Sequence, residues 1–248
     1  MTTKDYQKKC FAEYKIDIGY PDYYEYLYGN PINVLVPIET ATNNVMIVGA
    51  YPSAKFFTVK GIADTPLYDN DAPFSNETYF DGSRTRTIPS GQELNDIILK
   101  CIGIERQDCW ITDLVKVFLF KQGHIDRYLK LGKRDLTENR TMFNDYAIKS
   151  LSWLEMELSI AKPYAVILLG LEVISTICNI SNTESKKYLT GLSREVTIGK
   201  QTVNIIPLPH PGILMRRAER NPWPERFNKE IAPLAKTELK RLKKNACS

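Results

Sequence analysis

Residues 45–49 read Val-Met-Ile-Val-Gly, a continuous apolar run that ends in glycine. A run of this kind is typical of a parallel strand that is buried on both faces. Similar runs occur at residues 109–112 (Cys-Trp-Ile-Thr), 165–170 (Ala-Val-Ile-Leu-Leu-Gly) and 203–206 (Val-Asn-Ile-Ile). We therefore expect four central strands.

Helical patterns separate these runs. They cover residues 90–103, 140–161, 171–178 and 224–244. Strands that alternate with helices indicate a parallel sheet with helices on both faces. The sequence thus predicts an α/β protein with three layers, α/β/α, around a central, mainly parallel four-stranded sheet.

Three segments lie outside this alternation. Residues 1–44 are polar and rich in tyrosine, and we expect a short helical lead-in that packs on a main domain, residues 45–248. Residues 50–90 are rich in Pro, Asp, Asn, Ser and Gly, which predicts an unusually long loop of the functional or disordered kind. Residues 121–139 are charged and predict another loop.

The composition is that of a globular chain, with 248 residues, 43% hydrophobic and 25% charged, enough for one sizeable core. The five cysteines form no CxxC pair and no zinc-like spacing, which favours reduced thiols and no metal site. No apolar run approaches the roughly 20 residues of a membrane span. The first ten residues also lack the apolar stretch of a secretory signal. We expect a soluble, cytoplasmic monomer that needs no membrane.

Positive charge gathers near the C-terminus. The net charge is only +4, but residues 214–244 contain ten Lys or Arg and four Glu. A stretch of this kind can face phosphates. The alternative is a solvated helical face with Glu/Lys pairs.

Ligands of open parallel sheets bind at the carboxyl ends of the strands. Three of the expected strand ends carry distinctive residues: Gly49 to Ala54, Thr112-Asp113, and Leu208 to Gly212, which includes His210. Each is ordinary when taken alone, as a turn, a helix cap or a structural histidine.

Five motifs in order, however, resemble the uracil-DNA glycosylase superfamily, and its thermophile-type branch in particular. They are Gly49-Ala50-Tyr51-Pro52-Ser53; Pro73-Phe74 with Ser90-Gly91-Gln92; residues 111–117 (ITDLVKV); residues 153–158 (WLEMEL) with Lys162-Pro163-Tyr164; and residues 210–216 (HPGILMR). No single motif is specific, but their order is, and the resemblance covers about residues 45–235.

The resemblance implies an enzyme that extrudes one base from DNA into a pocket and cuts its N-glycosidic bond. It implies that Ala50, Tyr51, Pro52 and Ser53 line the pocket, that Phe74 stacks on the base and that Asp113 reads it. His210 would donate a hydrogen bond to the O2 atom of the departing pyrimidine. The residues implied to contact DNA are Ser90, Arg216, Arg217 and the apolar wedge Leu214. Core packing is the alternative for Leu214 and Phe74.

Two departures from the family concern chemistry. The iron–sulfur branch uses four cysteines, and the places of two hold Val117 and Ser150, so we expect no cluster, no other metal and no organic cofactor. The family's water-activating residue would fall at Ala50 or Tyr51, neither of which is a base at neutral pH. Candidate replacements are Asp64, Asp69, Asp71 and Asp81, of which we favour Asp71. The enzyme could also rely on leaving-group stabilisation alone.

A third departure concerns the base. Uracil enzymes read it with an asparagine, which accepts from N3–H and donates to O4, whereas this chain has Asp113. An ionised carboxylate only accepts, so it suits a base with an amino group, such as cytosine. Because a plain cytosine glycosylase would destroy its host genome, the sequence favours a modified cytosine, of the kind that phages use to mask their DNA, and a monofunctional, defensive enzyme.

The alternatives are a repair enzyme for uracil or another deaminated base, and an inactive DNA-binding relative. A nucleotide-binding protein is disfavoured, because the first strand is followed by neither GxGxxG nor GxxxxGK[ST].

Overall fold

The computed structural model describes residues 1–26, 29–52, 54–59, 62–68, 72–76, 78–80, 84–216 and 219–246. At residues 54–59, 62–68, 79, 80 and 86 it describes the backbone alone. Among the described helices, none is long and apolar enough to cross a bilayer.

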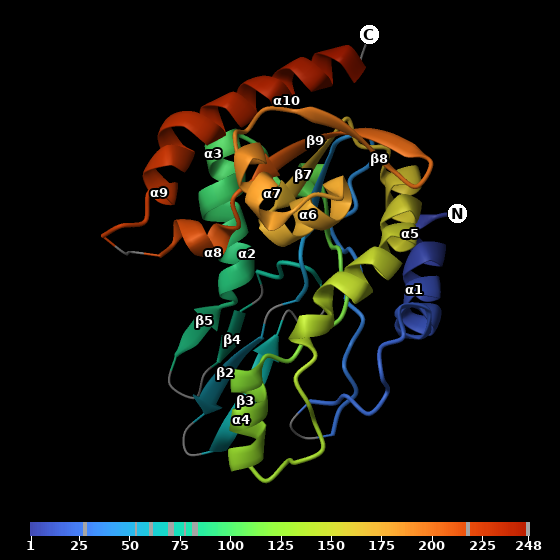
Figure 1. Ribbon diagram of the computed structural model, residues 1–248, viewed down its shortest axis with the longest axis vertical. Helices are drawn as coiled ribbons and strands as arrows, with labels where there is room; N and C mark the ends of the chain where they lie inside the picture. The colour runs from blue at the N-terminus through green and yellow to red at the C-terminus, as the bar shows by residue number, and fades with distance from the viewer. Residues whose placement is uncertain are drawn as a thin grey trace.

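A five-stranded sheet forms the centre of the described chain (Figure 1). In spatial order its strands are β6 (Cys109–Asp113), β1 (Val45–Gly49), β7 (Ala165–Leu169), β9 (Gln201–Leu208) and β8 (Arg194–Ile198). The first four are parallel, and β8 runs antiparallel to β9. The mainly parallel sheet is confirmed, with one strand more than expected.

Both faces of the sheet are covered. Met46 and Val48 of β1 pack into one hydrophobic cluster, with α1 (Thr3–Ile18), α5 (Phe143–Ala161) and α6 (Leu171–Cys178). Val45 and Ile47 pack into a second cluster on the opposite face. The alternation follows from strand geometry, in which successive side chains point to opposite faces, and it confirms the three-layer α/β/α architecture.

The second face is covered by two long helical stretches and a short one. The first comprises α2 (Pro89–Glu93), the π-helical segment η1 (Leu94–Leu99) and α3 (Lys100–Ile102). The other comprises α9 (Trp223–Arg226), the π-helical segment η4 (Phe227–Ile231) and α10 (Ala232–Ala246). The short helix α8 (Pro211–Leu214) lies beside α2 and η1. Three smaller elements are α7 (Asn182–Tyr188), which packs on α6, and two 3-10 turns, η2 (Arg106–Asp108) and η3 (Arg140–Met142).

The N-terminal helix α1 is longer than the short lead-in that we expected. Tyr6, Cys10, Tyr14 and Ile18 are fully buried at a spacing of four residues. This spacing places them on one face of the helix, where Tyr6 and Tyr14 pack edge-on against Trp153 of α5. Thus α1 shares its core with the sheet.

Two segments that we expected to be loops contain regular structure, and the central sheet has an extra edge strand. Within residues 50–90, β2 (Ala54–Val59) pairs with β3 (Ile62–Tyr68), and β4 (Thr78–Phe80) pairs with β5 (Thr85–Thr87). Each pair is an antiparallel two-stranded sheet that is separate from the central sheet. Residues 121–139 contain α4 (Gln122–Lys130), a helix that buries only Ile125 and Tyr128. The extra strand β8 buries only Ile198, because it lies at the sheet edge and needs no apolar run.

Candidate functional site

The carboxyl ends of four neighbouring strands lie along one edge of the sheet. In the order β6, β1, β7 and β9, these ends carry Asp113, Gly49, Gly170 and His210. Gly49 is the direct partner of Asp113 in the parallel ladder. Ligands of open parallel sheets bind at such an edge. The structure therefore brings three of the sequence-predicted loops, those of Tyr51, Asp113 and His210, to the same edge.

Asp113, Gly49 and Phe74 meet at this edge. A Cβ atom added to Gly49 would lie 2.1 Å from Oδ1 of Asp113 and 2.5 Å from Cε2 of Phe74. Asp113 is 2% and Phe74 7% exposed. A carboxylate and an aromatic ring thus approach each other over a residue that has no side chain.

Gly49→Ala tests how tight this arrangement is. The new methyl group has to displace the carboxylate or the ring, so we expect a loss of about 1–3 kcal/mol in the free energy of unfolding. Urea unfolding measures the loss. Gly123→Ala is the matched control, because a Cβ there meets nothing within 4 Å. Equal stability of the two variants would contradict the tight packing.

Phe74 has a backbone conformation that needs support. Its φ angle is +53°, in the left-handed region that is rare for a bulky residue. Nη2 of Arg106 donates to the Phe74 carbonyl (2.9 Å), while Nη1 donates to Oδ1 of Asn95 (3.2 Å) and Nε bonds to Glu39. The guanidinium group therefore fixes the backbone that presents the ring. No local sequence pattern singles out Arg106 for this contact.

His210 is the N-cap residue of α8, and its Nδ1 accepts a hydrogen bond from the backbone N–H of Gly212 (3.0 Å). In the neutral imidazole the proton then lies on Nε2, which is left to donate. Desolvation lowers the pKa of His210 below its ordinary value, Glu172 opposes this shift, and Lys121 and Arg216 add to it. His210 is an exposed residue, and with its pKa lowered the ring is mainly neutral at pH 7.

Gly170 lies beside this histidine at the end of β7. A Cβ atom on Gly170 would lie 3.2 Å from Cβ of His210, and its φ angle is +93°. Only glycine adopts this conformation without strain, so β7 and the His210 loop can approach closely.

Tyr51 is held by residues that the sequence analysis missed. Its hydroxyl accepts from Nε of Arg140 (2.8 Å), and that guanidinium group lies 4.7 Å from the ring centre. Arg140 also forms an ion pair with Glu172, which follows β7. The sequence could have pointed to Glu172, because it follows the apolar run of β7. Ligands bind at the carboxyl ends of parallel strands, and β7 is one of them.

The other residues that we expected to line a base pocket differ in burial. Ala50 is half-buried, its carbonyl accepts from the N–H of Val115 (2.9 Å), and Pro52 is buried. Ser53 and Asp71 lie outside the described residues, as do Asp69, Asp81 and the side chain of Asp64.

The residues expected to contact DNA lie near α8. Ser90 is half-buried in α2, which contacts α8. Leu214 is 8% exposed and belongs to the second core cluster, whereas the next residue, Met215, is 54% exposed. Arg216 is exposed, and Arg217 lies outside the described residues. In this structure Leu214 therefore packs in the core, which is the alternative that we gave for it.

The turn after α8 is fixed by a side chain. Nδ2 of Asn221 donates to the carbonyls of Ile213 (2.8 Å) and Arg216 (2.9 Å).

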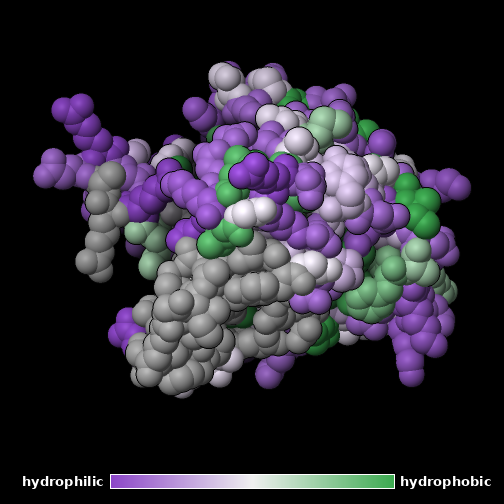
Figure 2. Space-filling view, turned by 90° about the horizontal axis from the view of Figure 1, so that it is seen from below, coloured by the Kyte–Doolittle hydropathy of each residue, from purple (hydrophilic) through white to green (hydrophobic). Residues whose placement is uncertain are grey.

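Figure 2 views the molecule from the end that carries the hairpins and α4, and its described surface there is mainly hydrophilic.

The basic C-terminal stretch divides between two ends of the molecule. Arg216 and Arg220 lie together next to α8. Lys236, Lys240 and Lys243 of α10 instead line a hollow with residues that precede β1, β6 and β7, namely Asn44, Asp108 and Tyr164. The stretch therefore does not form one basic face at the carboxyl edge.

His124, the other histidine, gives the protein a pH dependence of stability. Its Nδ1 accepts from the N–H of Lys121 (3.1 Å), and desolvation, followed by the charge of Lys121, lowers its pKa from 6.5 to about 4. The unfolded chain then binds a proton more readily than the folded one. We expect up to about 3 kcal/mol of stability, fully present above pH 6.5, to be lost as the pH falls toward 4.

Urea unfolding of wild type and His124→Gln between pH 7.5 and 4.5 measures this effect. The variant should lose less stability over that range, because it lacks the titration of His124. The carboxylates titrate in both proteins and therefore cancel in the comparison. Parallel pH profiles would contradict the assignment.

Comparison with known proteins adds an independent finding. The model of a family described as "Uracil DNA glycosylase superfamily" matches residues 37–232. No curated protein matches the chain. The matched region includes the whole central sheet and the strand ends described above.

Proposed function

Because the chain belongs to the uracil DNA glycosylase superfamily, we propose that it is an active DNA glycosylase, which flips one base out of DNA and hydrolyses its N-glycosidic bond. The observation that carries this proposal is the meeting of Asp113, Phe74 and Gly49 at the edge that also carries His210. A polar reader, an aromatic platform and a hydrogen-bond donor are the groups that base excision requires.

The proposed roles follow from these contacts. The flipped base stacks on Phe74, and Asp113 accepts from its Watson–Crick edge. As the bond between C1′ and N1 breaks, its electron pair moves onto the base, and Nε2–H of His210 donates to the O2 atom that gains negative charge. Water adds its oxygen to C1′ and gives up a proton, for which we propose Asp71 as acceptor. The departing base anion takes up a proton from solvent, and the products are a free base and an abasic site.

The proposed substrate is a modified cytosine. Asp113 supports this, because a carboxylate accepts from the cytosine N4 amine and repels the O4 atom of uracil. We propose a monofunctional, monomeric enzyme that needs no metal or cofactor and excises modified bases from masked phage DNA in the cytoplasm as a defence. Repair of uracil or another deaminated base is the second candidate, since the family supports it.

We further propose that DNA lies across α8 and the start of α2. Ser90, Arg216 and Arg217 would bind phosphates, and Ala50 to Ser53 would line the pocket. Leu214 would enter the base stack, which requires it to leave its present packing, whereas Met215 is already exposed.

The test is mass spectrometry of the bases released from a panel of phage genomes with modified cytosines, with uracil-containing DNA alongside. A released modified cytosine supports the proposal. Release of uracil alone favours the repair enzyme, and an absence of abasic sites from every DNA favours an inactive DNA-binding relative.

A further inference from the structure

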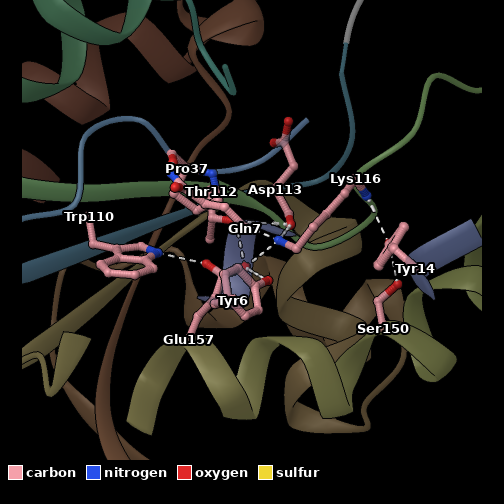
Figure 3. Close-up of polar contacts among 10 residues, drawn as sticks. All are labelled: Tyr6, Gln7, Tyr14, Pro37, Trp110, Thr112, Asp113, Lys116, Ser150 and Glu157. Atoms are coloured by element: carbon pink, nitrogen blue, oxygen red, sulfur yellow. Dashed lines mark hydrogen bonds and ion pairs between the residues drawn. The ribbon is translucent and has the colours of Figure 1, made fainter. Parts of the chain in front are cut away.

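A buried polar network lies directly behind Asp113 (Figure 3). Its centre is an ion pair between Lys116, which follows β6, and Glu157 of α5, whose side chains are 1% and 0% exposed. Three further members, Tyr6, Trp110 and Thr112, complete what we call the Lys116–Glu157 network.

The hydrogen bonds of Glu157 come from three side chains on two elements, β6 and α1. Its Oε2 accepts from Nε1 of Trp110 (2.7 Å), and its Oε1 accepts from the hydroxyls of Thr112 (3.1 Å) and Tyr6. Tyr6 belongs to α1, and it is the one member that lies outside the family-matched residues 37–232. The carboxylate is therefore fully bonded, as a buried charge requires.

Lys116 connects this carboxylate to Asp113. Its Nζ donates to Oγ1 of Thr112 (2.7 Å) and to the backbone carbonyl of Asp113 (2.9 Å), besides its contact with Glu157. Figure 3 shows the Asp113 carbonyl facing Lys116 while the carboxylate points away from the network. The ammonium group thus holds the backbone from which that carboxylate projects toward Gly49 and Phe74.

A second contact from α1 supports the same loop. The Tyr14 hydroxyl accepts from the backbone N–H of Lys116 (2.9 Å) and bonds to Oγ of Ser150 (2.6 Å). Ser150 in turn donates to the carbonyl of Tyr146 (2.7 Å), so Tyr14 is the donor toward Ser150. Ser150 is one of the positions where the iron–sulfur branch has a cysteine.

We infer that the Lys116–Glu157 network positions Asp113 for base recognition, and that α1 is part of this positioning through Tyr6. The inference rests on the proposed function, in which Asp113 reads the base. Tyr6, Lys116 and Glu157 are positioning residues, because they touch Asp113 or one another and not the base. Fully bonded buried networks fix one arrangement of the groups around them, which is what discrimination between similar bases needs.

Tyr6→Phe tests the inference, because it removes one hydroxyl and little else. We expect it to lower the ratio of kcat/KM between the preferred base and uracil roughly tenfold, near the lower end of the effect of one hydrogen bond to a charged group. Tyr20→Phe is the matched control, since Tyr20 is also buried but its hydroxyl bonds to the carbonyl of Phe118 (2.9 Å). If the Tyr6 hydroxyl had only a structural role, both variants would change the kcat/KM ratio equally, and that result would overturn the inference.

Two further measurements separate this inference from the proposed function. Combined with Asp113→Asn, Tyr6→Phe should change the ratio no further, because it acts through Asp113; an undiminished effect would overturn the inference. The carboxyl carbon shift of Asp113, measured by NMR at pH 7, should change in Tyr6→Phe and not in Tyr20→Phe. If the wild type releases no base, the proposed function fails, while this spectrum still decides whether the network positions Asp113.

Discussion

His210→Ala is expected to slow base release by about 10²- to 10³-fold, the effect of losing one donor to a developing oxyanion. The reason is that the N–H of Gly212 is bonded to Nδ1, so Nε2 carries the proton of the neutral ring and is the donor. Alanine has no donor to replace it. Single-turnover release of base from labelled DNA measures the rate, and a binding assay on the same DNA should change little.

The other histidine provides the control. His124→Gln should release base at the wild-type rate at pH 7.5, because Nδ1 of His124 is bonded to the N–H of Lys121 and we propose no role for this ring in base release. Equal rates for wild type and His210→Ala would remove His210 from the mechanism.

The rate should also follow the protonation of His210. Because its pKa is lowered, the neutral ring persists as the pH falls past 6.5, and the rate should hold there. At lower pH a proton on Nδ1 would face the Gly212 N–H, so the rate should fall. A fall centred above pH 6.5 would point to a different group.

Asp113→Asn is expected to reverse the preference of the enzyme. An asparagine amide both accepts from N3–H and donates to O4 of uracil, whereas a carboxylate cannot donate. Because the site is buried, an unmatched polar group there is costly. We expect the ratio of kcat/KM between the modified cytosine and uracil to change by roughly 10²- to 10⁴-fold in favour of uracil.

The same substitution at the other end of the strand is the control. Asp108 lies just before β6 and is exposed, so Asp108→Asn should leave the ratio unchanged. If Asp113→Asn keeps the wild-type preference, Asp113 does not read the base, and the argument for a modified cytosine fails with it.

Much of the fold could be predicted because its signals are local. A parallel strand buried on both faces has to be apolar along its whole length, and β1, β6 and β7 are fully buried. The same reasoning missed β8 and α4, because an edge strand and a surface helix bury few residues. It also read residues 50–90 as one loop, since hairpins that pair only with themselves leave no periodic apolar pattern.

Residue by residue, the sequence by itself determined which side chains stand at the strand ends, among them Asp113 and His210, because strand ends follow from where apolar runs stop. Only the tertiary structure decided what holds them: Arg106 on the Phe74 carbonyl, Arg140 on Tyr51, and Tyr6 on Glu157, which are 32, 89 and 151 residues apart. Contacts over such separations depend on how the layers pack, and no short-range pattern of residue types records that packing.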